Sequence, residues 1–444
     1  MKKQKIQKND TLQEVNILKT KSVTQKEPSM KQQVQNLKGF RDFLPEEKRA
    51  RDFVAATIAT VFQTFGFEPL ETPTLEYASL LLGKYGDEAD KLVYSFQDRG
   101  DREVALRYDQ TVPTSRVLAQ YQNELPKYFR RYQIQNVFRA DKPQKGRFRE
   151  FTQCDCDIFE SSSPLVDAEL LAVYYSVYKK LGITSIQLKI NDRQTLMDTI
   201  SPFAIPEADV FSIIQSVDKL DKLSLEDVTK ELVQKGLSAE DATQVLTAIT
   251  SATQSENLQQ IIAAALNLGV PENALVFTPT LARGLDYYTG MIFEGSIPEY
   301  TAGSVGGGGR YDNLIGELCG RDIAATGFAI GFDRTVEAVQ QLGLLPSELN
   351  TSSKVLVTLF DEASFKTSLE TATRLREAGI ATEIYPTFDK LGKQFKVADQ
   401  KNIPYVIIIG ETELSDGTVT LKNMKTGEQK TATLAALLED SKTF

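Results

Sequence analysis

The 444-residue sequence contains no histidine and no tryptophan, and it contains only three cysteines. The absence of histidine excludes Ser-His-Asp triads, histidine-based acid–base catalysis and every metal motif that uses an imidazole ligand. Cys154, Cys156 and Cys319 are too few for a disulfide framework or a cysteine zinc site, and they favour a reducing compartment. Any catalysis must therefore rely on arginine, lysine, carboxylates, amides and tyrosine, or on a metal held by oxygen ligands.

The chain also lacks long apolar runs. It has no stretch of about 18 apolar residues, and no hydrophobic signal segment lies near its start, so we expect no membrane span and a cytoplasmic location. Hydrophobic residues make up 41% of the chain and charged residues 25%, which is typical of globular proteins. The net charge of −9 argues against unspecific binding of nucleic acid, but it leaves room for a local basic surface.

Changes in composition along the chain predict its domain boundaries. Residues 1–29 are polar and lysine-rich, so we expect a disordered extension before a first domain at residues 30–340. Within that domain, signals for a mostly antiparallel sheet surround a helical insertion at about 192–271. A linker at 341–352 leads to residues 353–444, where short apolar strands alternate with helix-length segments, the pattern of a small parallel α/β domain.

Two local patterns near the start of the first domain predict a helix and then an edge strand. Apolar residues from Val54 to Phe65 recur at the spacing of an amphipathic helix, which we expect to end at Gly66. The next segment, "FEPLETPTLEY", contains Pro69 and Pro73, and these prolines favour a strand at the edge of a sheet.

The segment "FREFTQCDCDIF" predicts a strand with two very different faces. Alternate residues of a strand point to opposite sides, so Cys154, Cys156 and Ile158 suit a packed interior. The other side carries an amide and two carboxylates, from Gln153, Asp155 and Asp157. Such a buried polar face costs several kcal/mol in desolvation unless something pairs with it. A cationic or amine-bearing ligand would supply that pairing.

A basic turn precedes this strand. It contains Pro143 and Gly146 and is flanked by five cationic residues, Arg139, Lys142, Lys145, Arg147 and Arg149. Arginines in such an arrangement suit phosphate oxygens, which they bind through two parallel hydrogen bonds. The alternative is a solvated basic turn with no ligand.

Three later segments combine glycines with charged or aromatic residues. The run "GSVGGGGRYDNL" lacks the Lys-Ser/Thr of a phosphate-binding P-loop and the context of a dinucleotide motif. Its four consecutive glycines more plausibly let the backbone approach a ligand or another strand. "ARGLDYYTG" and "TGFAIGFDR" would each be unremarkable alone, as core packing with a surface charge.

Together these segments resemble the motifs of class II aminoacyl-tRNA synthetases, and among them those of the histidyl-tRNA synthetase family. The first helix with the Pro73 strand resembles motif 1, "FRADKPQKGRFREF" motif 2 and "GFAIGFDR" motif 3. "LARGLDYYTG" and "GGGGRYD" are similar to the family's histidine-specific segments, and "LRYDQTVPTSR" to the segment that holds the α-amino group. "LGKQFKVADQKNIPYVIIIGETEL" is similar to its anticodon-binding domain, so the resemblance spans about residues 37–440.

The resemblance implies an α+β fold: a class II catalytic domain with an antiparallel sheet and a helical insertion, followed by an α/β anticodon-binding domain. It implies a histidine–tRNA ligase that acts in two steps. The histidine carboxylate attacks the α-phosphate of ATP, giving histidyl-adenylate and pyrophosphate, and the 3′ end of tRNA(His) then takes the histidyl group and releases AMP. It also implies ATP as substrate, Mg²⁺ on the ATP phosphates, and a cytoplasmic homodimer.

The resemblance assigns roles to residues around histidine. Its ammonium group would be held by three polar side chains, those of Asp109, Thr111 and Gln153. Its imidazole ring would be bound by Asp157, Tyr287 and Tyr288. Asp155 receives no role, because the family varies at this position.

The resemblance also assigns residues to ATP. Arg139 would contact the α-phosphate and the histidine carboxylate, and Arg283 would lie beside them, so these two arginines are the expected catalytic residues. Arg147 would bind the outer phosphates, Phe151 would stack under the adenine, and Arg334 would close the site from the opposite side. We assign no metal ligand to the protein chain.

Two alternatives share this fold. One is the regulatory paralogue of ATP phosphoribosyltransferase, a binding protein that usually lacks the C-terminal domain and degrades the basic residues of motif 2. The other is a class II synthetase for a different amino acid. The paired tyrosines and the lack of a Cys/His zinc set argue against this alternative. Pyrophosphate exchange with each amino acid in turn would separate these alternatives.

Overall fold

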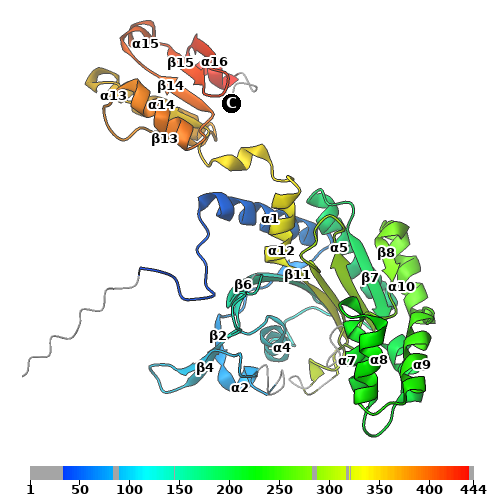
Figure 1. Ribbon diagram of the computed structural model, residues 1–444. Helices are drawn as coiled ribbons and strands as arrows, with labels where there is room; N and C mark the ends of the chain where they lie inside the picture. The colour runs from blue at the N-terminus through cyan, green and yellow to red at the C-terminus, as the bar shows by residue number, and fades with distance from the viewer. Residues whose placement is uncertain are drawn as a thin grey trace, which may run out of the picture. The chain divides into compact units, whose positions relative to one another are not determined.

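Figure 1 shows the protein as a computed structural model, which describes residues 34–83, 90–144, 146–282, 288–316, 320 and 322–439. The extension expected at residues 1–29 lies outside this part and stays a prediction. Residues 34–38 belong to a unit separate from the rest of the chain and form neither helix nor strand. In the described part, no helix has both the length and the apolar character that crossing a membrane requires.

An eight-stranded sheet with the order β1-β5-β6-β11-β10-β9-β7-β8 forms the centre of the first domain. Its strands are β1 (Glu68–Pro69), β5 (Arg130–Phe138), β6 (Glu150–Phe159), β7 (Gln187–Asp192), β8 (Leu275–Phe277), β9 (Met291–Ser296), β10 (Gly306–Arg310) and β11 (Ala325–Gly331). All inner pairs are antiparallel, whereas the edge strands β1 and β8 pair in parallel with β5 and β7. The mostly antiparallel sheet and the edge position of the proline-containing strand are therefore confirmed.

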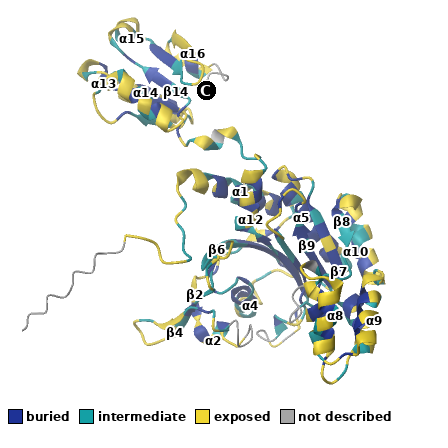
Figure 2. Ribbon diagram, viewed as in Figure 1, coloured by how far each residue is buried: buried dark blue, intermediate teal, exposed yellow. Residues whose placement is uncertain are grey.

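Helices cover one face of this sheet and bury its apolar side chains (Figure 1). They are α1 (Pro45–Thr64), α5 (Pro164–Lys180), α10 (Glu256–Asn267) and α12 (Phe332–Gln341). The predicted spacing on α1 buries Val54, Ile58 and Phe62 completely, and Gly66 follows the helix end with a φ of 76°. Each such side chain contributes about 1.5–3 kcal/mol through the surface that it removes from water. Figure 2 shows this buried layer between sheet and helices.

The two cysteines of β6 lie in this layer, as the alternation predicted. Cys154 and Cys156 are fully buried, and both are free thiols. Burial raises the pKa of each thiol well above its ordinary value, so both remain neutral at physiological pH. They act as small apolar residues of the core.

The opposite face of the sheet meets helix α4 (Thr111–Gln120) and a small three-stranded antiparallel sheet. That sheet has the order β2-β4-β3, and a short helix lies between β2 and β3 in the sequence. Its elements are β2 (Leu75–Tyr77), α2 (Ala78–Leu81), β3 (Ser95–Gln97) and β4 (Glu103–Leu106).

The segment between β7 and β8 is helical, as its composition indicated. It contains α6 (Arg193–Ile200), η1 (Ser201–Phe203), α7 (Val210–Val217), η2 (Asp218–Asp221), α8 (Leu225–Gln234), α9 (Ala239–Thr250), α10 and η3 (Glu272–Ala274). Serine side chains at positions 224, 238 and 255 accept backbone hydrogen bonds at the starts of α8, α9 and α10. The first helices pack around their own core, which contains Ile213, Val228 and Leu246.

The C-terminal residues form a separate five-stranded sheet, preceded by η4 (Ser347–Asn350), with the order β13-β12-β14-β15-β16. Its elements are β12 (Val355–Val357), α13 (Glu362–Glu377), β13 (Thr382–Ile384), α14 (Leu391–Gln400), β14 (Tyr405–Ile408), α15 (Glu411–Asp416), β15 (Val419–Asn423), β16 (Gln429–Ala432) and α16 (Leu434–Glu439). The apolar strand β12 pairs in parallel with β13 and with β14, as expected for a parallel α/β domain. The hairpin of β15 and β16 was missed, because β16 is polar and largely exposed and shows no alternating apolar pattern.

Candidate active site

A pocket of about 1060 Å³ lies on the face of the large sheet that the helix layer leaves open. The side chains of Gln153, Asp155 and Asp157 on β6 form one wall of it. On the neighbouring strand β11, the residues paired with these three are Gly331, Ala329 and Gly327. The predicted polar face therefore lies beside a floor that carries almost no side chains.

The glycine run predicted to let the backbone come close forms strand β10, which is hydrogen-bonded to β11 and β9. A Cβ atom on Gly308 would lie 2.0 Å from the carbonyl oxygen of Gly327, and one on Gly327 would lie 1.9 Å from Oδ1 of Asp157. Gly306 and Gly307 line the pocket directly. The glycines thus let two strands and a buried carboxyl group pack at distances that any side chain would prevent.

Replacing Gly327 with alanine should therefore lower the free energy of unfolding by about 1–3 kcal/mol, because the new methyl group displaces Asp157. Urea denaturation measures this loss. Gly392→Ala is the matched control, since nothing lies within 4 Å of its Cβ position in helix α14, and it should leave stability unchanged or slightly raised. An equal denaturation midpoint for Gly327→Ala and wild type would contradict the close packing described here.

Asp157, at the inner end of the polar wall, is held by two protein groups. Its Oδ2 lies 2.7 Å from Nη2 of Arg131 on β5, an ion pair without the alignment of a good hydrogen bond, and its Oδ1 accepts a hydrogen bond from the Tyr311 hydroxyl. Arg131 is fully buried and Asp157 is 5% exposed. Burial raises the pKa of Asp157 and the positive charge of Arg131 opposes this shift, while burial keeps the pKa of Tyr311 well above its ordinary value. Tyr311 therefore remains a hydrogen-bond donor.

Gln110 fixes the start of helix α4 against the polar wall. Its side-chain amide donates to the carbonyl oxygens of Gln135 and Gln153, at 3.0 and 3.1 Å. The residues on either side of it, Asp109 and Thr111, line the pocket as a result. The three side chains expected around an ammonium group, those of Asp109, Thr111 and Gln153, therefore line the same pocket.

Arg139, at the end of β5, enters the pocket from the basic hairpin. Its Nε donates to the carbonyl oxygen of Tyr108 at 3.1 Å, and its guanidinium lies 4.3 Å from the ring centre of Tyr108 and 5.2 Å from that of Phe151. The aromatic rings and the carbonyl group hold the guanidinium in place and leave it facing the cavity.

The other cationic residues of the pocket are more exposed. Arg147 lies 3.6 Å from Asp141, and 58% of its side chain is exposed. Arg334, in the first turn of α12, donates to the carbonyl oxygen of Ser304 at 2.7 Å. Both line the pocket, so the hairpin and α12 supply positive charge around it.

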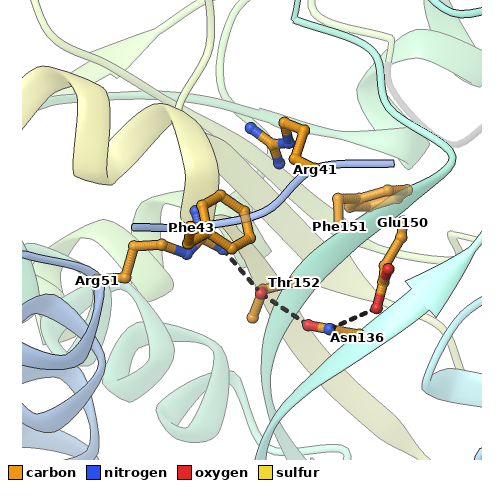
Figure 3. Close-up of a pocket in the computed structure, with 7 residues that line it drawn as sticks. All are labelled: Arg41, Phe43, Arg51, Asn136, Glu150, Phe151 and Thr152. Atoms are coloured by element: carbon orange, nitrogen blue, oxygen red, sulfur yellow. Dashed lines mark hydrogen bonds between the residues drawn. The ribbon is translucent and has the colours of Figure 1, made fainter. Parts of the chain in front are cut away.

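A smaller pocket of about 130 Å³ adjoins Phe151 and is shown in Figure 3. It is lined by Arg41, Phe43, Arg51, Asn136, Glu150, Phe151 and Thr152. A chain of hydrogen bonds crosses it, from Arg51 to Thr152 at 3.1 Å, from Thr152 to Asn136 at 2.9 Å and from Asn136 to Glu150 at 2.9 Å. The network braces the strand that carries Phe151.

The segment before α1 reaches the hairpin as well. The guanidinium of Arg41 lies 3.3 Å from the ring centre of Phe148 and donates to Asp333 at 3.0 Å. Arg51 pairs with the same carboxylate. The basic hairpin, α1 and α12 are therefore tied together by two arginines and one aspartate.

Most of the residues expected at the site surround the large pocket: Asp109, Thr111, Arg139, Arg147, Phe151, Gln153, Asp157, Tyr288 and Arg334. Arg283 and Tyr287 lie outside the described residues. The sequence reasoning missed Arg131, Tyr108 and Tyr311. The alternation of Arg131, Gln133 and Gln135 in "RYQIQ" was a signal that could have pointed to a second polar strand face.

Comparisons with known proteins agree with this geometry. The model of the histidyl-tRNA synthetase family matches residues 39–335, and that of an anticodon-binding domain matches residues 354–442. The chain is 41% identical to the histidine–tRNA ligase of Christiangramia forsetii (88% of this chain, 95% of the relative). It is 39% identical to that of Phocaeicola vulgatus (90% and 97%).

Solved structures match it as well. The histidyl-tRNA synthetase from Nostoc sp. PCC 7120 is 30% identical with a TM-score of 0.82, over 92% of this chain and 98% of its own. The apo histidyl-tRNA synthetase of S. aureus is 25% identical with a TM-score of 0.68, over 91% and 99%. By its sequence along nearly the whole chain and by its fold, the chain belongs to the histidyl-tRNA synthetase family of class II aminoacyl-tRNA synthetases.

Proposed function

We propose that the large pocket is where this family member joins histidine to tRNA(His), with ATP as the source of energy. The supporting observation is that the polar row of β6 and the arginines of the hairpin and of α12 open into one cavity. Its volume of about 1060 Å³ is at the upper end of that of small-molecule sites, which suits an amino acid and a nucleotide bound together.

In the first step, a carboxylate oxygen of histidine bonds to the α-phosphorus of ATP, and the bond from that phosphorus to the β-phosphate oxygen breaks. Pyrophosphate leaves, and histidyl-adenylate remains. Arg139 faces the cavity beside Asp109 and Phe151, where it would draw the two anionic reactants together and offset the charge that builds on the α-phosphate. Because no proton must be transferred, a chain without histidine can carry out this step.

The other pocket residues divide between the two substrates. We place the histidine ammonium group against Asp109, Thr111 and Gln153, which the Gln110 amide holds together. Phe151 would stack on the adenine, with Arg147 and Arg334 on the outer phosphates and the nucleotide. Mg²⁺ would neutralise phosphate charge and be held mainly by the nucleotide and water.

The second step requires tRNA, in which a ribose hydroxyl at the 3′ end takes the histidyl group and AMP leaves. We propose that the C-terminal sheet binds the anticodon, which the match of residues 354–442 supports. We also propose a cytoplasmic homodimer. Its support is the resemblance to motif 1 together with the exposed Leu75 and Tyr77 on β2, whose side chains are 45% and 60% exposed.

Pyrophosphate exchange with each of the twenty amino acids tests the proposed function. We expect isotope from pyrophosphate to enter ATP with histidine and with no other amino acid. Exchange that is absent with histidine, or equally fast with another amino acid, would refute the assignment.

A chain that ends after Thr351 should form histidyl-adenylate at the normal rate but charge tRNA poorly. Only the second step depends on binding of the tRNA anticodon. This end point keeps the carbonyl groups of Leu349 and Asn350, to which Arg49 donates at 2.6 and 2.9 Å. Single-turnover rates for the two steps measure the effect, with Arg49→Lys in the full chain as a control for the loss of this contact. Equal losses in both steps would mean that the C-terminal residues also support the catalytic site.

A further inference from the structure

The segment before α1, residues 39–43, lies against the basic hairpin between β5 and β6. The carbonyl oxygen of Gly39 accepts a hydrogen bond from the backbone N–H of Arg149 at 2.9 Å. A Cβ atom on Gly39 would lie 2.9 Å from Cγ of Pro143 and from Cγ of Arg149. The φ of Gly39 is 93°, a conformation that also favours glycine. This glycine therefore lets the segment pack directly on the hairpin.

Arg41, two residues further on, connects the hairpin to α12. Its guanidinium lies 3.3 Å from the ring centre of Phe148, and its Nη2 donates to Oδ1 of Asp333 at 3.0 Å. Arg41 lines the smaller pocket (Figure 3), whereas Phe148, Asp333 and Arg334 line the large one. Arg41 therefore contacts two parts of the wall of the large pocket, which come from distant parts of the sequence.

The contacts of Arg41 bear on the position of Arg147. Phe148 follows Arg147 directly in the hairpin, so a contact that fixes the Phe148 ring also limits where the Arg147 guanidinium can lie. Arg147 itself is 58% exposed, and its distance of 3.6 Å from Asp141 indicates a weak ion pair. Its position therefore depends mainly on the backbone of the hairpin.

An arginine suits the position between the hairpin and α12 because its guanidinium is planar. One face can stack on an aromatic ring while the edge donates to a carboxylate. Asp333 also pairs with Arg51, whose guanidinium lies 3.9 Å from the ring centre of Phe43. Loss of the Arg41 charge therefore leaves Asp333 with a cationic partner, so the position of the hairpin can be changed with little effect on stability.

We propose that Arg41 is a positioning residue for the formation of histidyl-adenylate. It acts through Phe148 and Asp333, and it keeps the hairpin at the distance from α12 at which Arg147 and Arg334 both reach the bound nucleotide. The inference rests on the proposed function, because it explains how the two arginines assigned to ATP are held in place before ATP arrives.

The first experiment measures pyrophosphate exchange for Arg41→Gln. The KM for ATP should rise about tenfold, because the hairpin is no longer held by its cation–π contact. The KM for histidine should stay within about twofold, since the residues proposed to bind it lie on β6 and at the start of α4. The melting temperature should stay close to that of wild type, because Arg51 still pairs with Asp333.

Arg130→Gln is the matched control. Arg130 pairs with Glu169 at 2.6 Å, and the two side chains are 30% and 20% exposed, against 24% and 21% for Arg41 and Asp333. The guanidinium of Arg130 also lies 5.7 Å from the ring centre of Phe67. The control thus removes an ion pair and an aromatic contact of similar exposure at the other end of β5, and it should leave both KM values unchanged.

A second experiment tests whether Arg41 acts through Phe148. Phe148→Leu removes the aromatic ring and keeps an apolar side chain of similar reach. Arg41→Gln in that background should change the KM for ATP by less than about twofold, because the contact through which it acts is already lost. A further tenfold rise in the double variant would mean that Arg41 binds ATP directly, and this result would overturn the proposal.

Hydrogen exchange of the ligand-free protein gives a readout that does not depend on activity. The backbone N–H groups of Arg147 and Arg149 are bonded to the carbonyl oxygens of Gln144 and Gly39, both at 2.9 Å. They should exchange about tenfold faster in Arg41→Gln and at the wild-type rate in Arg130→Gln.

Unchanged hydrogen exchange or an unchanged KM for ATP in Arg41→Gln would overturn the proposal. A lower melting temperature with equal rises in both KM values would overturn it as well, by showing a merely structural role. Wild type without histidine-dependent pyrophosphate exchange would instead refute the proposed function, while hydrogen exchange would still show whether Arg41 holds the hairpin.

Discussion

Replacing Arg139 with alanine should slow the formation of histidyl-adenylate by about 10²–10³-fold, equivalent to about 3–4 kcal/mol. The guanidinium is held by the Tyr108 carbonyl oxygen and by two aromatic rings, so its position is fixed before the substrates arrive. Such a group meets developing charge without further reorganisation, and its loss should lower turnover more than substrate affinity. Single-turnover measurement of adenylate formation gives the rate directly.

Arg147→Ala is the control for this prediction, since its side chain is 58% exposed and lies at the rim of the same hairpin. It should mainly raise the KM for ATP, because a solvated arginine contributes less to the transition state than an enclosed one. Transfer from preformed histidyl-adenylate to tRNA should be slowed much less by Arg139→Ala than adenylate formation. Equal effects of the two substitutions on turnover would mean that Arg139 only attracts the nucleotide.

Replacing Arg131 with methionine should lower the free energy of unfolding by about 3–5 kcal/mol. Arg131 is fully buried, and its removal leaves the enclosed Asp157 with the Tyr311 hydroxyl as its one remaining partner among the residues that the structure describes. The loss reports the cost of an uncompensated buried charge and not the strength of the ion pair itself. Thermal and urea denaturation of the variant measure it.

The double variant Arg131→Met with Asp157→Asn separates these contributions. Because it removes both charges, it should recover much of the stability that Arg131→Met loses, although it should bind histidine poorly. If the single variant proves as stable as wild type, Asp157 is neutral in the folded protein and the pair carries no charge.

The sequence predicted which side chains lie on each face of β6 better than it predicted their contacts with neighbouring strands. The alternation of β6 correctly separated Cys154 and Cys156 from the polar row, because the direction of a side chain follows from its parity along the strand. The pairing of Asp157 with Arg131 depends instead on the register between β5 and β6, which a single sequence does not specify.

Contacts between residues far apart in the sequence could not be predicted, for a related reason. Tyr311 lies 154 positions from Asp157, and only the folding of β10 against β11 brings its hydroxyl to the carboxyl group. Asp155 was set aside because the family varies there, although the structure places it, buried, in the lining of the pocket. Most of the residues that the family resemblance named line one pocket, whereas their partners could be identified only from the fold.

The buried thiols of β6 have a practical consequence for spectroscopy. Alkylating dyes react with thiolates that they can reach, and Cys154 and Cys156 are both enclosed and neutral. Once Cys319 is replaced, a cysteine introduced on an exposed helix such as α8 should accept a fluorophore without competition from these two thiols. Pairs of such labels would report distance changes during catalysis while the native core keeps its own cysteines.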